Sequence, residues 1–175
     1  MAISGKSAKS LNYTEFDSPL GKIVLGEYNG KICLVEFKGS TRAKSSLNFL
    51  SKHYGTDIKK NENQVLSNAK KQFGQYFSGK LSKFTLPLDY AGTEFQEAIW
   101  KQLSKIPYGK TVNYGWVAEK AGNPKAARAA GAAIGDNRIS IIVPCHRVVG
   151  KDGSLTGYGG GLKKKEWLLA HERTN

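Results

Sequence analysis

The sequence predicts a two-part α+β protein, with an antiparallel sheet and helices in residues 1–90 and a mostly helical second part in residues 91–175. Asn29-Gly30 joins two runs rich in β-forming residues, which is the strongest short pattern for a β-hairpin. After residue 92, apolar residues recur at helical spacing, and a turn containing glycine separates two short helical stretches. With 175 residues and 39% hydrophobic content, the chain can bury a sizeable core.

The first part is expected to supply the sheet and two helices. In chain order, the pattern predicts strands over 11–16, 21–28 and 31–37 and helices over 43–53 and 61–77. Residues 84–88 are expected to form an edge strand, because Pro87 cannot donate a ladder hydrogen bond. Cys33 falls within the third strand, where a buried, inert thiol is the ordinary interpretation. Nothing in this part has the pattern of a catalytic group.

The second part is expected to be built from short helices. Thr93 can cap the first, whose inward face is formed by Phe95, Ile99, Trp100 and Leu103. A second helix is predicted over 112–121, followed by a turn. Pro124 is then expected to be the first residue of a helix that runs through 134, and a last helix is predicted over 163–173. Helix, glycine-containing turn and helix together form a helix-turn-helix pattern.

The second helix of that pattern carries unusually small side chains. Arg128 is the one long side chain among alanines and Gly131. A helix that reads bases in the major groove usually exposes longer polar side chains. Small residues allow close approach of the helix backbone, as the narrow minor groove requires. The alternative is that the alanines pack against another helix.

The candidate nucleophile is Cys145, which lies between two apolar segments. Residues 141–143 are not expected to continue as a helix, because the proline at 144 disfavours helix in the residue before it. Cys145 and His146 then fall on a tight turn before Val148. A cysteine held in a turn beside a histidine fits a fixed nucleophile, although a free cysteine is more often a small buried hydrophobe.

Composition narrows the possible partners and compartment. Lys and Arg number 27 against 14 Asp and Glu, giving a formal net charge of +13. Such a balance favours nucleic acid as the partner, and an anionic membrane surface second. Two cysteines are too few for a disulfide scaffold, and no metal-ligand spacing, secretory signal or membrane span is present. We therefore expect a protein of the cytoplasm, or of the nucleus in a eukaryote, with no metal and no cofactor.

Several motifs of the second part together resemble the O6-alkylguanine-DNA alkyltransferases. Pro144-Cys145-His146-Arg147-Val148 is similar to their active-site motif, and residues 123–129 are similar to their recognition helix. Further matching residues, in the same order, are Phe95-Gln96, Ile106-Pro107-Tyr108-Gly109, Tyr114, Asn137, Tyr158 and Lys165-Glu166-Trp167-Leu168-Leu169. The close match covers residues 93–172. The resemblance implies a ribonuclease H-like first part and a DNA-binding helix-turn-helix in the second.

The resemblance also implies how DNA is engaged. The damaged base would be flipped out of the duplex, because guanine O6 cannot be reached inside the stack. Arg128 would fill the gap, and Tyr114 would crowd the 3′ phosphate. The small face that would lie in the minor groove consists of Ala126, Ala127, Ala129 and Gly131.

The chemistry that the resemblance implies is a direct displacement. Cys145 would attack the alkyl carbon of O6-alkylguanine, and O4-alkylthymine stays open as a second substrate. His146 would accept the thiol proton through a water molecule, and Glu172 would orient His146. Tyr114 would protonate the leaving guanine, and Asn137 would brace the helix-turn-helix against the active-site turn. Because a thioether has no good leaving route, each molecule would act once.

The implied substrate pocket includes Val148, Tyr158, Gly159, Gly160 and Lys165. Gly159 departs from family members that place a serine there to bind the alkylated oxygen. The cysteines and histidines of the zinc site of some members are absent, and so is the regulatory domain of some bacterial relatives. We expect a monomer whose partner is double-stranded DNA carrying O6-alkylguanine.

Two rival functions remain open at this stage. A lesion-binding or transcription-regulating module would need an inert Cys145. A cysteine hydrolase would turn over a small substrate, and it would leave the basic charge, Arg128 and the alanine-rich helix without a use. A steep loss of binding with salt would favour the DNA functions over the hydrolase.

Overall fold

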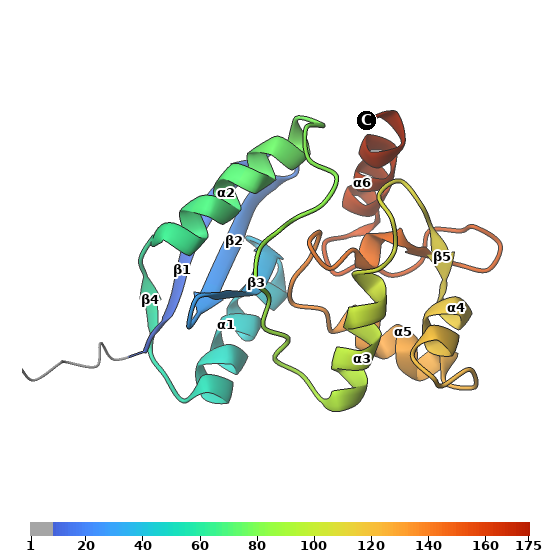
Figure 1. Ribbon diagram of the computed structural model, residues 1–175, viewed down its shortest axis with the longest axis horizontal. Helices are drawn as coiled ribbons and strands as arrows, with labels where there is room; N and C mark the ends of the chain where they lie inside the picture. The colour runs from blue at the N-terminus through green and yellow to red at the C-terminus, as the bar shows by residue number, and fades with distance from the viewer. Residues whose placement is uncertain (1–8) are drawn as a thin grey trace, which may run out of the picture.

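The computed structural model describes residues 9–175 and has the two parts that the sequence predicts (Figure 1). The N-terminal part contains β1 (Leu11–Ser18), β2 (Gly21–Tyr28), β3 (Lys31–Phe37), α1 (Thr41–Tyr54), β4 (Ile58–Lys60) and α2 (Gln64–Phe77). The sheet order is β3-β2-β1-β4, in which β1, β2 and β3 are antiparallel and β4 runs parallel to β1. The α+β class is confirmed.

The two helices of the N-terminal part cover opposite faces of the sheet. Because side chains alternate along a strand, Val24 packs in one cluster with Leu50 of α1, whereas Ile23 packs in another with Phe73 of α2. The second cluster continues into the C-terminal part. Only the α2 face of the sheet therefore shares a core with the candidate site.

The local turn chemistry predicted for the hairpin is present. Asn29 and Gly30 have φ angles of 52° and 82°, the left-handed values that a two-residue hairpin turn needs. The prediction of an edge strand over 84–88 was wrong in the length of the strand. It makes one bridge, between Leu88 and Ile32 of β3, and Ile32 N donates to the Pro87 carbonyl at 2.8 Å. The Asp89 amide returns a hydrogen bond to the Ile32 carbonyl at 2.9 Å, but Pro87 has no amide hydrogen with which to continue the ladder, so pairing does not spread.

The C-terminal part consists of α3 (Glu94–Leu103), β5 (Val112–Asn113), α4 (Tyr114–Lys120), α5 (Ala127–Gly135), a 3₁₀ turn η1 (Cys145–Arg147), β6 (Val148–Val149) and α6 (Leu162–Thr174). Thr93 caps α3 as predicted, in a capping box with Gln96. α4 and α5 form the predicted pair of short helices, on the side of α3 away from the sheet (Figure 1).

Two predicted helix boundaries in this part were wrong. The helix predicted from residue 112 begins at Tyr114, because β5 pairs with β6 and Asn113 then caps the helix. Pro124 does not begin the next helix. The amide of Ala126 closes a separate turn onto the Asn123 carbonyl at 2.9 Å, and α5 begins at Ala127.

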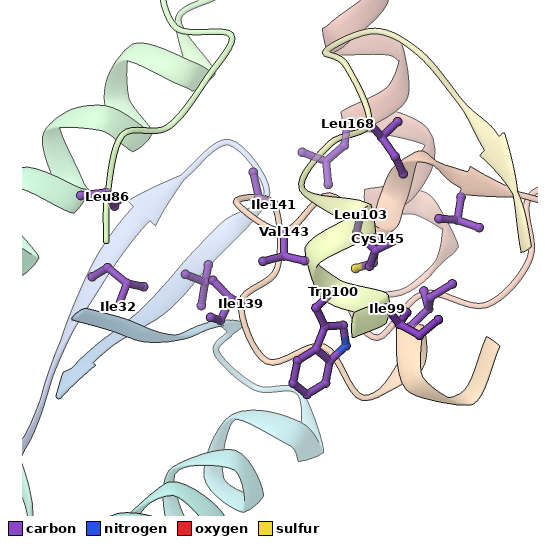
Figure 2. Close-up of a cluster of buried hydrophobic side chains, with 14 of the residues drawn as sticks. Ile32, Leu86, Ile99, Trp100, Leu103, Ile139, Ile141, Val143, Cys145 and Leu168 are labelled. Carbon is purple, nitrogen blue, oxygen red and sulfur yellow. The ribbon is translucent and has the colours of Figure 1, made fainter. Parts of the chain in front are cut away.

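The segment before Cys145 joins the two parts. Val35 of β3 donates to the Arg138 carbonyl at 2.8 Å and accepts from the Ser140 amide at 3.0 Å. Residues 138–140 thus extend the sheet beyond β3. Ile139, Ile141 and Val143 enter one buried cluster with the sheet and α3, in which Cys145 also lies (Figure 2). Packing from both parts therefore fixes the chain that leads to the cysteine.

No helix within residues 9–175 is both long enough and apolar enough to cross a bilayer. The expected lack of a secretory signal depends on the polar start of the chain. Residues 1–8 of that start lie outside the described residues.

Candidate active site

Cys145 is the first residue of η1, on the tight turn that the sequence predicts. Its side chain is buried, with 8% of the residue exposed. Upstream, Ile141 has a φ of 72°, which is unfavourable for a β-branched residue. Ile141 is almost completely buried, so packing holds this strained conformation. The backbone that presents the thiol is thus fixed by the core.

Asn137, which follows α5, holds the sulfur directly. Its side-chain nitrogen donates to the Val143 carbonyl at 2.9 Å and to Cys145 Sγ at 3.2 Å, and its oxygen accepts from the Ile139 amide at 2.9 Å. Burial raises the pKa of Cys145, and the hydrogen bond from Asn137 opposes this rise. The resting thiol is therefore protonated at neutral pH, and its use as a nucleophile requires a base.

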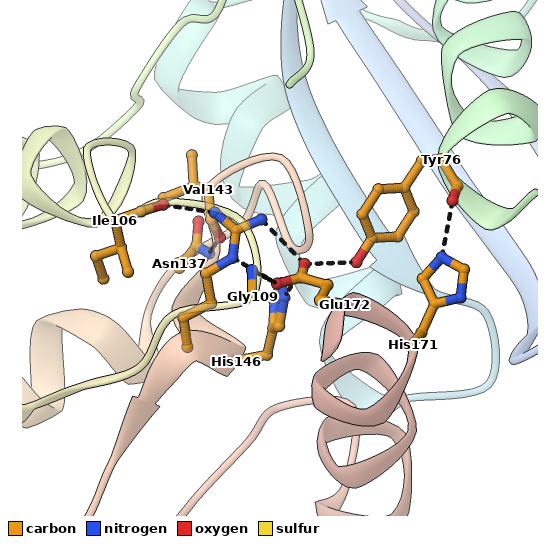
Figure 3. Close-up of polar contacts among 9 residues, drawn as sticks. Tyr76, Ile106, Gly109, Asn137, Val143, His146, His171 and Glu172 are labelled. Atoms are coloured by element: carbon orange, nitrogen blue, oxygen red, sulfur yellow. Dashed lines mark hydrogen bonds and ion pairs between the residues drawn. The ribbon is translucent and has the colours of Figure 1, made fainter. Parts of the chain in front are cut away.

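His146, the residue that follows Cys145, forms a buried pair with Glu172 (Figure 3). His146 Nε2 lies 2.7 Å from Glu172 Oε1, and neither side chain is exposed. Burial lowers the pKa of His146, although Glu172 acts against this shift. Because a carboxylate can only accept, the hydrogen of this bond is on Nε2. Nδ1 then carries the free lone pair, and it has no hydrogen-bond partner among the described residues.

Glu172 receives hydrogen bonds from four residues. Besides His146, Arg147 donates through Nε at 2.8 Å and Nη2 at 3.0 Å, Tyr76 through its hydroxyl at 2.7 Å, and the Gly109 amide at 3.2 Å. Burial by itself would raise the pKa of Glu172. The hydrogen bonds from His146 and Arg147 outweigh burial and hold this pKa well below its ordinary range, so the carboxylate stays charged.

A cavity of about 190 Å³ opens in front of the thiol. It is lined by Arg42, Tyr114, Gly131, Ile134, Gly135, Asn137, Ser140, Cys145, Gly157, Tyr158 and Gly159. Six of these were singled out from the sequence. Val148, Gly160 and Lys165 were also expected in the pocket, but they do not line this cavity.

Those three residues instead hold the glycine-rich loop, residues 154–161, beside the cavity. Lys165 is fully buried, and its Nζ donates to the carbonyls of Val148 and Thr156 at 2.6 Å each. A Cβ atom at position 160 would lie 2.7 Å from the ring of Phe37, which is too close for a van der Waals contact. Glycine is therefore needed for the loop to pack on β3.

The small face of α5 is available to a partner. Arg128 and Ala129 are exposed, and Ala126, Ala127 and Gly131 are half-buried. The buried side of the helix packs inward, where Trp100 Nε1 donates to the Ala133 carbonyl at 2.7 Å. Both interpretations of the alanines therefore apply, to opposite sides of one helix. Tyr114, at the start of α4, shares a hydrogen bond of 2.9 Å with Thr156 Oγ1.

Two residues of the N-terminal part reach the site, and sequence reasoning missed both. Arg42 of α1 donates to the carbonyls of Gly135 and Asn137. A Cβ at Gly159 would collide with its guanidinium, so Arg42 occupies the space next to this glycine. Tyr76 of α2 bonds Glu172. No local motif marks either residue, because their roles depend on contacts between distant segments.

The side chains of the described residues form no metal centre. Within residues 9–175, no group of three or more His, Cys, Asp or Glu side chains is placed to hold a metal ion. Cys33 and Cys145 are both free and buried. The chemistry available at the site is that of a thiol, a neutral imidazole and a charged carboxylate.

Comparison with known proteins identifies the family. Residues 94–174 match the family described as 6-O-methylguanine DNA methyltransferase, DNA binding domain, and residues 11–90 match its ribonuclease-like domain. A methylated-DNA–protein-cysteine methyltransferase of Mycolicibacterium paratuberculosis is 42% identical over 163 residues, which cover 93% of each chain. The crystal structure of the Mycobacterium tuberculosis O6-methylguanine methyltransferase is 40% identical with a TM-score of 0.80, covering 94% of this chain and 93% of that one.

A structure of the Mycobacterium tuberculosis protein in complex with DNA is 39% identical, with a TM-score of 0.80 over 93% of both chains. The chain therefore belongs to the 6-O-methylguanine DNA methyltransferase family, whose activity is DNA repair by transfer of an alkyl group from guanine O6 to a cysteine of the protein.

Proposed function

We propose that Cys145 is the alkyl acceptor. The observation that carries this proposal is that Cys145 lines a cavity, that Asn137 holds its Sγ, and that the next residue, His146, is paired with the buried Glu172. In the reaction a bond forms between Sγ and the alkyl carbon, and the bond from that carbon to guanine O6 breaks. The products are a thioether on the protein and unmodified guanine in the DNA.

The route of the proton transfers follows from the protonation states of the side chains in the resting site. The Cys145 proton passes to His146 Nδ1 through a bridging water, since Nδ1 is the unprotonated nitrogen. The imidazolium formed is stabilised by Glu172, whose negative charge is already fixed. Tyr114, which lines the cavity, donates its hydroxyl proton to the leaving guanine, and the tyrosinate then regains a proton from the imidazolium through solvent, so the thiol proton ends on guanine. This is the nucleophile, base and orienting-group arrangement of cysteine catalysis in general.

The DNA substrate is a duplex with O6-alkylguanine, engaged through its minor groove. The exposed Arg128, the small face of α5 and a net charge of +13 support this proposal, as does the solved DNA complex of the Mycobacterium tuberculosis relative. Arg128 takes the place of the flipped base. The space next to Gly159, where other members place a serine, is filled here by Arg42.

We further propose that residues 1–90 support a DNA-binding and acceptor domain of residues 91–175, and that the protein acts as a monomer. The match of two separate family descriptions to the two parts supports the division. A cytoplasmic location, or a nuclear one in a eukaryote, agrees with the two free thiols.

Stoichiometry tests the proposed function. A duplex with one O6-methylguanine is supplied in tenfold excess, and restored guanine is counted against protein. We expect one guanine per protein molecule and no further turnover, and no repair by a Cys145→Ser variant that still binds the duplex. Continued turnover, or repair by the variant, would contradict the proposal.

A further inference from the structure

Tyr76 belongs to α2 of the N-terminal part, yet its hydroxyl enters the buried network behind the thiol. The hydroxyl donates to Glu172 Oε1 at 2.7 Å, the oxygen that also accepts from His146 Nε2 at 2.7 Å (Figure 3). Tyr76 is 1% exposed. Arg147 Nη2 donates to the same oxygen at 3.0 Å. Three donors therefore share one carboxylate oxygen, and Tyr76 is the one that comes from the N-terminal part.

Two consecutive residues of α6 hold Tyr76 at both of its ends. Glu172 accepts the hydroxyl, and His171 Nε2 donates to the Tyr76 main-chain carbonyl at 2.8 Å. The His171 ring is itself stacked on Trp167, with centroids 4.9 Å apart. The position of the hydroxyl is therefore fixed relative to the catalytic carboxylate, rather than set by packing on the sheet alone.

We propose that Tyr76 is a positioning residue for alkyl transfer, supplied by the N-terminal part, which tunes how strongly Glu172 holds His146. The proposal rests on the proposed function of Cys145 and His146. Tyr76 contacts neither the thiol nor the substrate cavity, so it acts through Glu172. Burial, followed by the charge of Glu172, raises the pKa of Tyr76 far above its ordinary value, so the hydroxyl remains a donor throughout the working pH range.

The direction of the effect follows from the shared oxygen. When the hydroxyl donates to Oε1, it takes up part of the negative charge that would otherwise act on Nε2. Removing this donor strengthens the remaining bond from His146 and favours the doubly protonated imidazole. His146 would then keep its extra proton to a higher pH, and Nδ1 could accept the thiol proton only above that pH.

The other groups around the pair stay in place when only the hydroxyl is removed. Arg147 and Tyr108 interact electrostatically with Glu172. The positive charges of Arg147 and Lys165 lower the pKa of His146. The charges of Glu36, Arg42 and Lys165 affect the pKa of Cys145. None of these groups hydrogen-bonds to the Tyr76 hydroxyl, so a change in the pH profile on its removal reports on the shared oxygen.

The experiment measures the pH dependence of single-turnover alkyl transfer from free O6-benzylguanine to the full-length protein. The free base removes DNA binding from the readout. The wild type is compared with Tyr76→Phe, and with Tyr54→Phe as the matched control. Tyr54 lies on α1, where its ring stacks on Tyr28 at 4.0 Å in the other hydrophobic cluster. Thermal unfolding of each variant is recorded in parallel.

We expect the acidic limb of the Tyr76→Phe profile to move upward by about one pH unit, with a rate up to about tenfold lower below the limb and equal rates above it. Tyr54→Phe is expected to keep the wild-type limb. A purely structural role would lower Tm and the plateau without moving the limb, and a superposable limb would overturn the inference while leaving the proposed function intact. Failure of the wild type to be alkylated at Cys145 would instead refute the proposed function.

Should Tyr76→Phe fail to fold, His171→Ala provides the second variant. It keeps the hydroxyl but releases the Tyr76 carbonyl, so the hydrogen bond to Glu172 becomes less well fixed. We expect a smaller upward shift of the same limb. An unchanged limb in this folded variant would also contradict the inference.

Discussion

At the residue scale, Cys145 shows how burial and hydrogen bonding oppose each other in one site. Burial raises the pKa of the thiol, and the hydrogen bond from Asn137 acts against it. In the proposed reaction, the sulfur stays a thiol until a substrate arrives and the neutral His146 accepts its proton.

The contacts of Asn137 predict a strong effect of its removal. Asn137→Ala deletes the donor to Sγ, removes one of the two donors to the Val143 carbonyl, which keeps the Cys145 amide, and leaves the Ile139 amide without its partner. We expect a loss of about 1–3 kcal/mol in the free energy of unfolding and a rate of alkyl transfer at least tenfold lower. Urea unfolding and single-turnover kinetics measure the two effects. An unchanged transfer rate would refute the role of Asn137 in holding the thiol.

Glu36 of β3 predicts a pH dependence of stability. It is 1% exposed, and burial raises its pKa to about 7 despite the nearby Arg42. The folded state therefore binds a proton on the Glu36 carboxyl more tightly than the unfolded state does. The stabilisation that results is fully present below about pH 4.3 and is lost as the pH rises to about 7.

The size of this effect is up to about 3 kcal/mol. We expect Glu36→Gln to flatten the fall in unfolding free energy between pH 5 and pH 8, as measured by urea unfolding. Glu166→Gln, at an exposed position of α6, is the matched control and should leave the wild-type curve unchanged. Identical curves for all three proteins would contradict the interpretation of Glu36.

At the element scale, α5 combines a buried side that packs on α3 with an exposed side of small residues and Arg128. We expect Arg128→Ala to slow repair of a duplex at least tenfold more than the reaction with free O6-benzylguanine, because only the duplex requires base flipping. Lys120→Ala, which removes a cation from the end of α4, controls for the loss of charge. Equal losses on duplex and free base would exclude the extrusion role of Arg128.

Elements whose formation depends on neighbouring residues could be predicted from the sequence. The Asn29-Gly30 hairpin and the Thr93 cap of α3 are examples, since their geometry is decided within four residues. The three-residue β4 was not predicted, because it exists only through pairing with β1, and α5 began later than Pro124 indicates. The same distinction holds at the site, where the motif at Cys145 is local but Arg42 and Tyr76 arrive from the other part of the chain.

At the scale of the whole molecule, the two parts share the buried cluster on the α2 face of the sheet. β3, Arg42 and Tyr76 all connect the N-terminal part to the segment or network around Cys145. The N-terminal part is thus physically continuous with the candidate active site, and the proposed effect of Tyr76 on the chemistry depends on this continuity.

The net charge of +13 predicts salt-sensitive binding of the whole protein to DNA. If about five phosphates are neutralised, affinity for an unmodified duplex falls by roughly two to three orders of magnitude between 50 and 200 mM salt. Titrations by fluorescence anisotropy at several salt concentrations measure the slope. A flat dependence would argue against a charged contact with the DNA backbone.

The most direct test of the central claim, that Cys145 accepts the alkyl group, is the intact mass of the protein after it is mixed with an equimolar duplex containing one O6-methylguanine. The account predicts a mass increase of a single methyl group, mapped by peptide analysis to Cys145 and absent from Cys33. An unchanged mass, or a methyl group on any other residue, would contradict it.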